Sequence, residues 1–372
     1  MRAMTARRKS IWFSAWTGLS KVATKSSIRT QKKVSKAVGK AVGKAMGEAS
    51  ARNATKVSAA TRRMFTGVVS PVPAPGNRGS GHWHEGHWGL GPLAQRKYRL
   101  FTPAGVSKTR PASLLVLLHG CGQDSASFAA STSAAAIARV QGCMVLLPEQ
   151  SSQANSQRCW NWFRAGVHVA AEAMLLMAIV EHVCGQHAVR RDRVYLLGMS
   201  AGGSMALTMA LRFPERFAGV LSHSGAVPHS ASNAVQATQA MRGHRAPDVA
   251  ALRLALGGRQ LPPLLLVHGD LDHSVVPDNA LASASLWLDL LPHPHAMPAP
   301  GHGRLVQRGT RRAYTRTDWK LAGQNYVSLI RVAGLGHAWS GGSKAQAFSD
   351  PAGPDALKLA LRFFADSVPR HA

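Results

Sequence analysis

Acidic residues, cysteines and long apolar runs are scarce in this sequence. Its 372 residues contain 17 Asp and Glu against 45 Lys and Arg, a formal net charge of +28. The four cysteines show no C-x-x-C spacing, so a zinc ribbon is not expected. The most apolar helical run, residues 173–180, lies between Glu172 and Glu181, whereas a membrane-spanning helix needs about 20 apolar residues. A transmembrane protein is therefore not predicted.

The positive charge is concentrated at the N-terminus. Residues 1–70 carry 16 Lys and Arg and a single acid, Glu48, so their net charge is +15 and the other 302 residues carry +13. Valine, lysine and glycine each recur at every fourth position between residues 34 and 47, which in a helix gives an apolar stripe opposite lysines. We predict a basic low-complexity tail that is either disordered or an amphipathic helix formed on an anionic surface such as a membrane, polymer granule or nucleic acid. No specific nucleic-acid target is predicted.

Only part of a secretory signal is present at the N-terminus. Arg7, Arg8 and Lys9 precede an apolar start at Ile11, but the apolar stretch ends by Lys21 and no small-residue cleavage site follows. A conventional signal peptide is not predicted, which favours a cytoplasmic protein.

A proline- and glycine-rich linker, residues 71–80, is predicted to join the tail to a folded domain over 81–372. The domain begins with His82, His84 and His87, whose spacing fits either a metal site or the period of two of a β-hairpin. Nothing else in the segment completes a coordination set, so no metal site and no cofactor are predicted.

From about residue 110, short apolar runs alternate with helix-like stretches such as 170–183 and 203–212, and residues 354–364 are predicted to form a closing helix. Near-continuous apolar runs are typical of strands buried on both faces of a parallel sheet. We therefore predict an α/β fold with a mostly parallel central sheet and helices on both faces. The predicted strands are 114–118, 144–147, 194–197, 219–221, 264–267 and 327–332. The segment 291–316 is predicted to be an insertion before the last of these strands.

The strongest local motif is G-x-S-x-G at residues 198–202, with Ser200 at its centre. It directly follows the predicted strand 194–197 and precedes a helix-like stretch, which is the context of a nucleophile elbow. The serine of an elbow lies on a sharp turn with unusual backbone angles, and the flanking glycines allow close backbone packing. Ser200 is therefore the predicted nucleophile.

A serine nucleophile needs a base and an acid that orients the base, in the chain order Ser, Asp, His on this kind of scaffold. The predicted strand 264–267 is followed by Asp270 and Asp272 at its carboxyl end, where ligand sites of such sheets lie. We favour Asp272, which lies further into the loop, and keep Asp270 as the alternative.

The base is expected after the last predicted strand. Residues 327–332 lead into a glycine-rich loop that contains His337, so we predict that this imidazole lies between the aspartate and the serine. The chain has 17 histidines, and His268, His273 and His223 remain alternatives.

Acyl transfer also needs preorganised N–H groups that stabilise a developing oxyanion. One is predicted at Ala201, the residue after the nucleophile. The second is expected in the loop 119–123, where Cys121 is the first candidate and Gly122 the second.

Six short motifs follow one another along the chain: HGCGQ at 119–123, PEQ at 148–150, CWNWF at 159–163, GMSAGG at 198–203, HGDLD at 268–272 and GLGHAWSGG at 334–342. In this order they resemble the poly(3-hydroxybutyrate) depolymerase family of esterases in the α/β-hydrolase superfamily, to which feruloyl and acetylxylan esterases are related. The resemblance covers about residues 95–368. It implies an α/β-hydrolase fold and a serine esterase without a cofactor, with Ser200, Asp272 and His337 as nucleophile, acid and base.

Other features of the site are hypotheses. Cys121 and Cys159 lie in loops that should approach the site, so a disulfide between them is one hypothesis, and buried free thiols are the alternative. A disulfide would favour an oxidising compartment, and the resemblance implies an extracellular or periplasmic location. Trp160, Trp162 and Trp339 are candidates for substrate contact, although core packing explains the first two equally well. Short-chain esters or hydroxyalkanoate oligomers are the expected substrates, rather than solid polyester, because no separate polymer-binding domain is seen at the C-terminus.

Other functions stay open at this point. A feruloyl- or acetylxylan-type esterase, or a serine peptidase, uses the same scaffold and the same acyl-transfer chemistry. A non-catalytic binder of an anionic surface or polymer granule, acting through the basic tail, is the alternative of another class. Such a binder has no need of a complete set of Ser, Asp and His.

Overall fold

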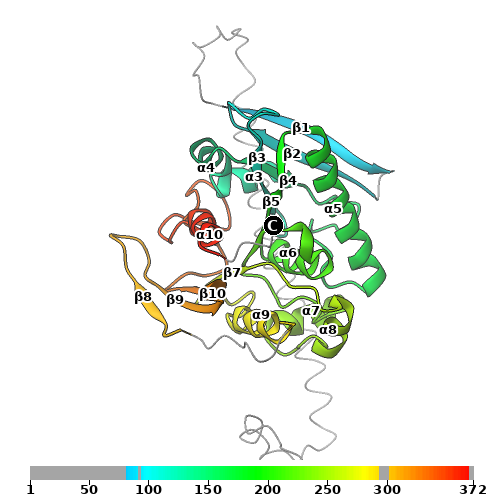
Figure 1. Ribbon diagram of the computed structural model, residues 1–372. Helices are drawn as coiled ribbons and strands as arrows, with labels where there is room; N and C mark the ends of the chain where they lie inside the picture. The colour runs from blue at the N-terminus through cyan, green and yellow to red at the C-terminus, as the bar shows by residue number, and fades with distance from the viewer. Residues whose placement is uncertain (1–80, 91–93, 293–300, 368–372) are drawn as a thin grey trace, which may run out of the picture. The chain divides into compact units, whose positions relative to one another are not determined.

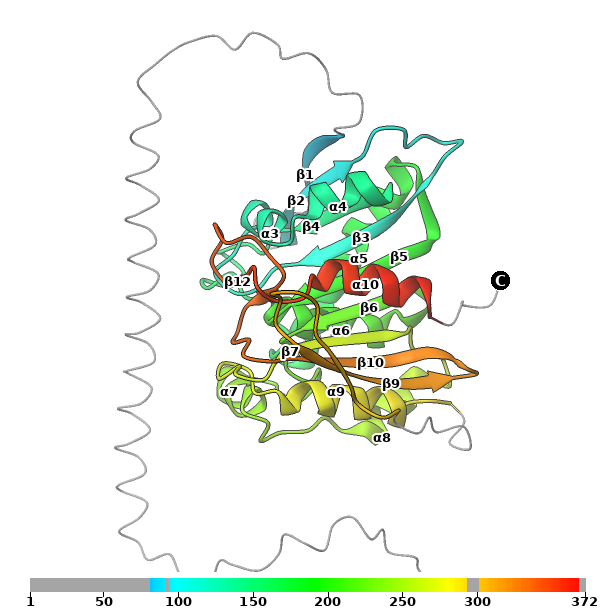
Figure 2. The same cartoon turned by 90° about the vertical axis from the view of Figure 1, so that its left-hand side faces the viewer.

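The computed structural model describes residues 81–90, 94–292 and 301–367, which contain a ten-stranded sheet (Figure 1). Six central strands run parallel and an antiparallel pair extends each edge, in the order β1-β2-β4-β3-β5-β6-β7-β10-β9-β8 (Figure 2). The parallel strands are β4 (Met144–Pro148), β3 (Ala112–Leu118), β5 (Val189–Met199), β6 (Gly219–His223), β7 (Leu264–Gly269) and β10 (Gln324–Val332). The edge pairs are β1 (His82–Leu90) with β2 (Gln95–Thr102), and β9 (Tyr314–Leu321) with β8 (Arg304–Val306). A separate short pair is β11 (Trp339–Ser340) with β12 (Ser349–Asp350).

Helices cover both faces of this sheet (Figure 1). Along β3, Leu114, Val116 and Leu118 belong to one apolar cluster, while Leu115 and Leu117 belong to the other, because successive side chains point to opposite faces. The first face is covered by α5 (Gly166–Gln186), α6 (Ala201–Arg212), α7 (Ala234–Met241), α8 (Val249–Leu256) and α9 (Asp278–Asp289). The second face is covered by α3 (Ser125–Ser131), α4 (Ala134–Gln141) and α10 (Ala356–Ala365).

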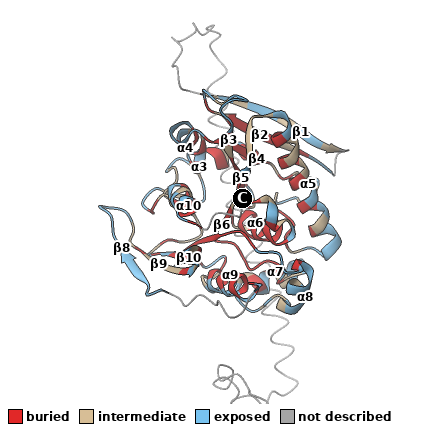
Figure 3. Ribbon diagram, in the orientation of Figure 1, coloured by how far each residue is buried: buried red, intermediate tan, exposed pale blue. Residues whose placement is uncertain are grey.

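The predicted fold is confirmed. Each of the six apolar runs is one of the parallel strands, and the three predicted helices are α5, α6 and α10. Every residue of β4, β6 and β7 is buried, as Figure 3 shows for the centre of the sheet. Full burial of one Leu or Val side chain contributes roughly 1.5–3 kcal/mol, so these strands anchor the molecule.

Two parts of the chain differ from expectation. The described part of the predicted insertion adds β8 and the start of β9 to the sheet, which the sequence does not predict because β8 is largely exposed and has no apolar run. Helix α5 has 21 residues and, contrary to expectation, is long and apolar enough to cross a membrane. Half of its apolar window is buried in the protein, however, as in the core helix of a soluble protein. The predicted tail 1–70 and linker 71–80 lie outside the described residues.

The turn from β5 into α6 is the tightest backbone packing around the predicted nucleophile. A Cβ on Gly198 would lie 2.2 Å from the carbonyl oxygen of Gly202, and a Cβ on Gly202 would lie 2.1 Å from the carbonyl oxygen of Leu118. Backbone atoms cannot move aside as the end of a side chain can. These two positions therefore require glycine, which explains the glycines of the G-x-S-x-G motif.

Replacing Gly202 with Ala is expected to lower the free energy of unfolding by about 3 kcal/mol or more, because the new methyl group overlaps the backbone of β3. Urea unfolding followed by circular dichroism measures this change. Gly185→Ala is the matched control, since nothing lies within 4 Å of a Cβ there; this helical position should be neutral or gain up to about 1 kcal/mol. Equal stability of the two variants would contradict the packing argument.

Candidate active site

Ser200 lies in the turn between β5 and α6 with a backbone that ordinary residues rarely adopt. Its φ is 55° and its ψ is −121°, and its N–H donates to the carbonyl oxygen of His223 at 2.8 Å. This bond ties the turn to the end of β6, which offsets part of the cost of the positive φ. The hydroxyl is thereby presented at the carboxyl end of the parallel strands.

A continuous hydrogen-bonded chain joins the three residues that the sequence singles out. His337 Nε2 lies 2.9 Å from Ser200 Oγ, and His337 Nδ1 lies 2.7 Å from Asp272 Oδ2. The Asp272 side chain is fully buried, whereas the His337 side chain is 17% exposed. An imidazole that donates from Nδ1 to a carboxylate presents Nε2 as an acceptor for the serine proton.

The two competing aspartates have different partners. Asp272 Oδ1 accepts the N–H groups of Ser274 and Val275 at 3.0 and 2.9 Å, which leaves Oδ2 for the histidine. Asp270 Oδ1 accepts the N–H of Gly334 at 2.7 Å. Asp270 therefore holds the start of the loop that carries His337, and it is Asp272 that contacts the imidazole.

Asp272 is held in its ionised form. Burial by itself raises the pKa of this carboxyl group, but hydrogen bonds from His268 and His337 outweigh burial and hold the pKa far below its usual range. His268 Nε2 lies 3.4 Å from Asp272 Oδ2 and 2.8 Å from the carbonyl oxygen of Val275. His268 therefore contacts the carboxylate of Asp272. It does not take the place of the base between Asp272 and Ser200, for which the sequence kept it as an alternative.

His223, another alternative base, holds the histidine loop. Its Nε2 accepts the N–H of Ser340 at 3.1 Å, and its ring stacks on Trp339 with centroids 5.1 Å apart. Burial and the neighbouring His268 and His337 lower the pKa of His223 to about 3. The remaining alternative, His273, is exposed.

His223 makes stability depend on pH, with a direction that follows from its lowered pKa. The unfolded chain takes up a proton below about pH 6.5, whereas the folded chain keeps His223 neutral down to about pH 3. Its contribution is therefore fully present above pH 6.5 and is lost towards pH 3, by up to about 1.4 kcal/mol per pH unit. Urea unfolding at several pH values should show a shallower decline in His223→Gln, which keeps an acceptor for Ser340 but does not titrate. Parallel curves for the two proteins would contradict this assignment.

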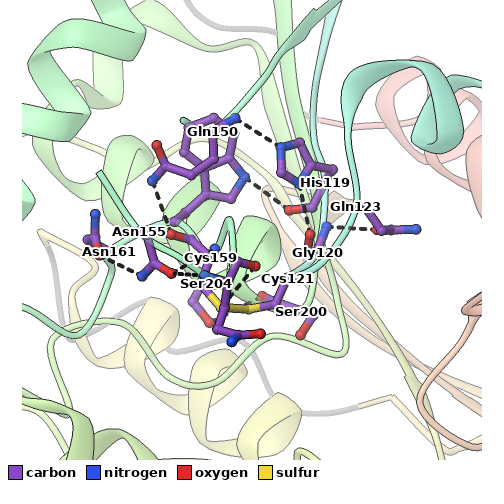
Figure 4. Close-up of a disulfide and its surroundings, with 12 residues drawn as sticks. His119, Gly120, Cys121, Gln123, Gln150, Asn155, Cys159, Asn161, Ser200 and Ser204 are labelled. Carbon is purple, nitrogen blue, oxygen red and sulfur yellow. Dashed lines mark hydrogen bonds between the residues drawn. A yellow bond between two sulfur atoms is a disulfide. The ribbon is translucent and has the colours of Figure 1, made fainter. Parts of the chain in front are cut away.

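The loop after β3 presents one unused N–H next to the serine (Figure 4). The N–H of Gly120 donates to Gln123 Oε1 at 2.9 Å, and the N–H of Gly122 donates to the carbonyl oxygen of Gln157 at 2.8 Å. Among the described residues the N–H of Cys121 has no hydrogen-bond partner, and neither has that of Ala201. Gly122, the reserve candidate for the oxyanion, is therefore already occupied, while the two preferred donors are free.

His119 and Trp160 fix the conformation of this loop. His119 Nδ1 donates to the carbonyl oxygen of Gly120 at 2.8 Å, and its Nε2 accepts the N–H of Gln150 at 3.1 Å. Burial lowers the pKa of His119, so the ring stays neutral with the proton on Nδ1. Trp160 Nε1 donates to the carbonyl oxygen of His119 at 3.0 Å.

A buried carboxylate that the sequence did not single out supports the same loop. Glu172, on α5, accepts from Arg96 at 3.0 Å, from Gln150 Nε2 at 2.6 Å and from the N–H of Asn161 at 2.5 Å. A buried ion pair is tolerated only where additional hydrogen bonds satisfy it, as they do here. Gln150 carries this support to His119 through its backbone N–H. No local sequence signal identifies Glu172, because its partners are 11 to 76 residues away.

The disulfide that the loop positions suggested is present. Cys121 and Cys159 are bonded, with their Cα atoms 4.2 Å apart, and Figure 4 shows the bond beside Ser200. The bond joins the loop after β3 to the loop that precedes α5. Cys143 and Cys184 are free and buried, and burial raises the pKa of Cys143 to about 12.

The cysteines give a prediction that needs no substrate. Because Cys143 and Cys184 are buried thiols, neither should react with a thiol reagent at pH 8 in the folded protein. Titration with dithionitrobenzoate should find two thiols after unfolding in urea and four after unfolding with prior reduction. Four thiols without reduction would contradict the disulfide.

The tryptophans require a correction. Trp160 and Trp339 are 0% and 1% exposed, so their rings have almost no surface to offer a substrate, and they pack inside the protein. Their predicted role in substrate contact is therefore wrong, because each ring supports a catalytic loop from behind. Trp162 is also buried but lines a cavity beside α5.

The three histidines of β1 do not all lie on one face of the strand. His84 faces His187 with ring centroids 6.3 Å apart, whereas His87 is on the opposite face of the strand. Within residues 81–90, 94–292 and 301–367, no three His, Cys, Asp or Glu side chains lie close enough to hold a metal ion.

Comparison with known proteins agrees with this geometry. The family model "Esterase PHB depolymerase" matches residues 96–304, more than half of the chain. The chain belongs to this family. The family is the one that the six motifs resemble, so that resemblance is confirmed.

Curated relatives carry names of the same kind. Poly(3-hydroxyalkanoate) depolymerase C of Paucimonas lemoignei is 32% identical over 185 residues, 48% of this chain and 44% of the relative. Feruloyl esterase B of Neurospora crassa is 28% identical over 220 residues, 55% of this chain and 73% of the relative. The chain thus spans less than half the length of the depolymerase that it matches.

A solved structure supports the fold. The acetyl xylan esterase from Aspergillus awamori superimposes with a TM-score of 0.59, covering 77% of this chain and all of the other at 15% identity. At that identity the likeness concerns the fold alone. It agrees with the α/β-hydrolase fold that the sequence predicts for this chain.

Proposed function

We propose that this protein is a serine esterase that hydrolyses carboxylic esters through an acyl-enzyme intermediate. Ser200 is the nucleophile, His337 the general base and Asp272 the acid that orients it. The N–H groups of Cys121 and Ala201 form the oxyanion hole. The observation that supports this most is the unbroken chain from Asp272 through His337 to Ser200, with two unpaired N–H groups beside it.

In the proposed reaction, Ser200 Oγ attacks the ester carbonyl carbon while its proton passes to His337 Nε2. The carbonyl oxygen becomes an oxyanion that accepts from the two N–H groups. His337 then gives the proton to the leaving alcohol, and the acyl group stays on Ser200. Water, deprotonated by His337, attacks the acyl carbon. The bond between the acyl carbon and Ser200 Oγ then breaks, His337 returns the proton to Ser200 Oγ, and the acid is released. Ionised Asp272 stabilises the imidazolium form in both halves.

Short-chain esters and hydroxyalkanoate oligomers are the proposed substrates, in keeping with the depolymerase and esterase names of the relatives. We propose that residues 81–372 are the catalytic domain and that the basic tail is an extension able to contact an anionic surface. The Cys121–Cys159 disulfide favours an oxidising compartment. A peptidase is not favoured by any of these names.

Replacing Ser200 with Ala is expected to lower kcat for p-nitrophenyl acetate and butyrate by at least about 10⁴-fold, because no other nucleophile occupies its place. Spectrophotometric release of p-nitrophenol measures the rate. Circular dichroism of the variant controls for folding. Equal rates for the two proteins would defeat the proposal.

Removal of residues 1–70 should leave these rates unchanged, whereas a binder that works through its tail would have no ester turnover to retain.

The two aspartates offer a matched pair of variants. Asp272→Asn should lower kcat by about 10⁴-fold, because an amide cannot orient His337 or stabilise its charged form. Asp270→Asn keeps an oxygen for the N–H of Gly334 and should change kcat by no more than about threefold. The reverse order of effects would assign the acid to Asp270.

A further inference from the structure

The cavity that Trp162 lines is separate from Ser200, Asp272 and His337 and lies on the face of the sheet that carries α5, α6 and α8. Its volume is about 570 Å³, and it is lined by parts of these three helices and by the loop around Trp162. Ser200, Asp272 and His337 do not line it. The reaction proposed above therefore leaves this cavity unexplained.

The charged groups that line the cavity are all basic. They are the exposed arginines Arg164, Arg212 and Arg259, and no acidic residue is among the lining residues. Arg259 pairs with Glu215 at 3.3 Å, outside the lining. Arg212 contacts the sulfur of Met174 at 3.7 Å, and in the described part of the chain neither Arg212 nor Arg164 has a carboxylate within ion-pair distance. Of the three arginines only Arg259 has a carboxylate partner among the described residues, so the cavity keeps a net positive charge that favours an anion.

His229 adds a second observation. Its φ is 59°, a left-handed backbone that costs about 1–3 kcal/mol in a residue other than glycine. Burial, followed by the charge of Arg212, lowers the pKa of His229, and both residues line the cavity. A strained residue is thus held at the wall of the cavity, beside a guanidinium that has no carboxylate partner.

The rest of the wall is apolar. Ala170, Phe213, Ala231 and Leu252 are half-buried and line the cavity, so they offer apolar surface to a ligand. A small inorganic anion would leave this apolar surface without a partner. An anion that carries a short alkyl chain satisfies both parts of the wall.

We propose that this cavity is a separate binding site for a monocarboxylate with a short alkyl chain. The carboxylate pairs with the guanidinium groups of Arg164 and Arg212, and the alkyl chain packs against Phe213 and Leu252. Choosing this class of ligand rests on the proposed function, because ester hydrolysis releases such acids. Trp162 lines the cavity and follows Cys159 in the chain. Cys159 is bonded to Cys121 in the loop 119–123, the proposed oxyanion loop.

Calorimetric titration of the full chain tests the site directly. The probes are sodium 3-hydroxybutyrate, which represents the hydroxy-acid product, sodium octanoate, which represents a fatty acid, and uncharged octanol. We expect saturable binding of a carboxylate, weakened by added salt, and no comparable binding of octanol. Arg164→Gln combined with Arg212→Gln should weaken carboxylate binding at least tenfold. The control pair Arg193→Gln and Arg331→Gln removes the same charge from exposed positions away from the cavity and should bind as the wild type does.

Ala255→Trp supplies a second variant that keeps every charge. Ala255 is exposed on α8 and lines the cavity, so a tryptophan there fills the space without disturbing the core, and carboxylate binding should be lost. Tighter binding of 3-hydroxybutyrate assigns the ligand to the hydroxy-acid products, and tighter binding of octanoate assigns it to the fatty acids. Absence of saturable binding, or equal binding by the arginine double variant, would overturn the site. Because binding is measured without turnover, Ser200→Ala should bind the carboxylate normally, which separates failure of this site from failure of the esterase proposal.

Discussion

The two hydrogen bonds of His337 are the interaction on which the site depends. They join loops that follow β5, β7 and β10, so the serine, the acid and the base meet only if these three strands end at the same edge of the sheet. Parallel strands satisfy that condition by their topology. The buried strands therefore act as the rigid frame, and the loops supply the chemistry.

The side chains that support these loops are polar and hydrogen-bonded. Asp270 holds the loop of His337 through Gly334, and His223 holds it through Ser340. On the other side of the serine, Glu172 and Gln150 reach the oxyanion loop through His119. A buried polar group without a hydrogen-bond partner lowers the stability of a protein. Each of these side chains has a partner, so each loop is held in one conformation. Such rigidity is what preorganised N–H donors require.

The sequence predicts the fold, and it singles out three residues that the structure brings together, because the signals are local. Apolar runs identify the strands and the glycines around Ser200 identify the turn. Position in the loops after two predicted strands favours Asp272 and His337 over their competitors. The misses have a different physical character. Trp160 and Trp339 were assigned to the substrate although they pack inside the protein, since an aromatic residue near a motif does not reveal which way its ring points. Glu172 went unnoticed because its role arises from contacts made across the sequence. The cavity of Arg164 and Arg212 is likewise formed by segments with no shared motif.

The central claim is that the hydroxyl of Ser200 is made reactive by its neighbours. Treatment of the full chain with a fluorophosphonate, followed by proteolysis and mass spectrometry of the peptides, tests it most directly, because only an activated serine forms the covalent adduct. We expect one adduct per chain, on the peptide that contains Ser200, with loss of ester hydrolysis in proportion to labelling. An adduct on another residue, or full hydrolysis after complete labelling of Ser200, would contradict the account.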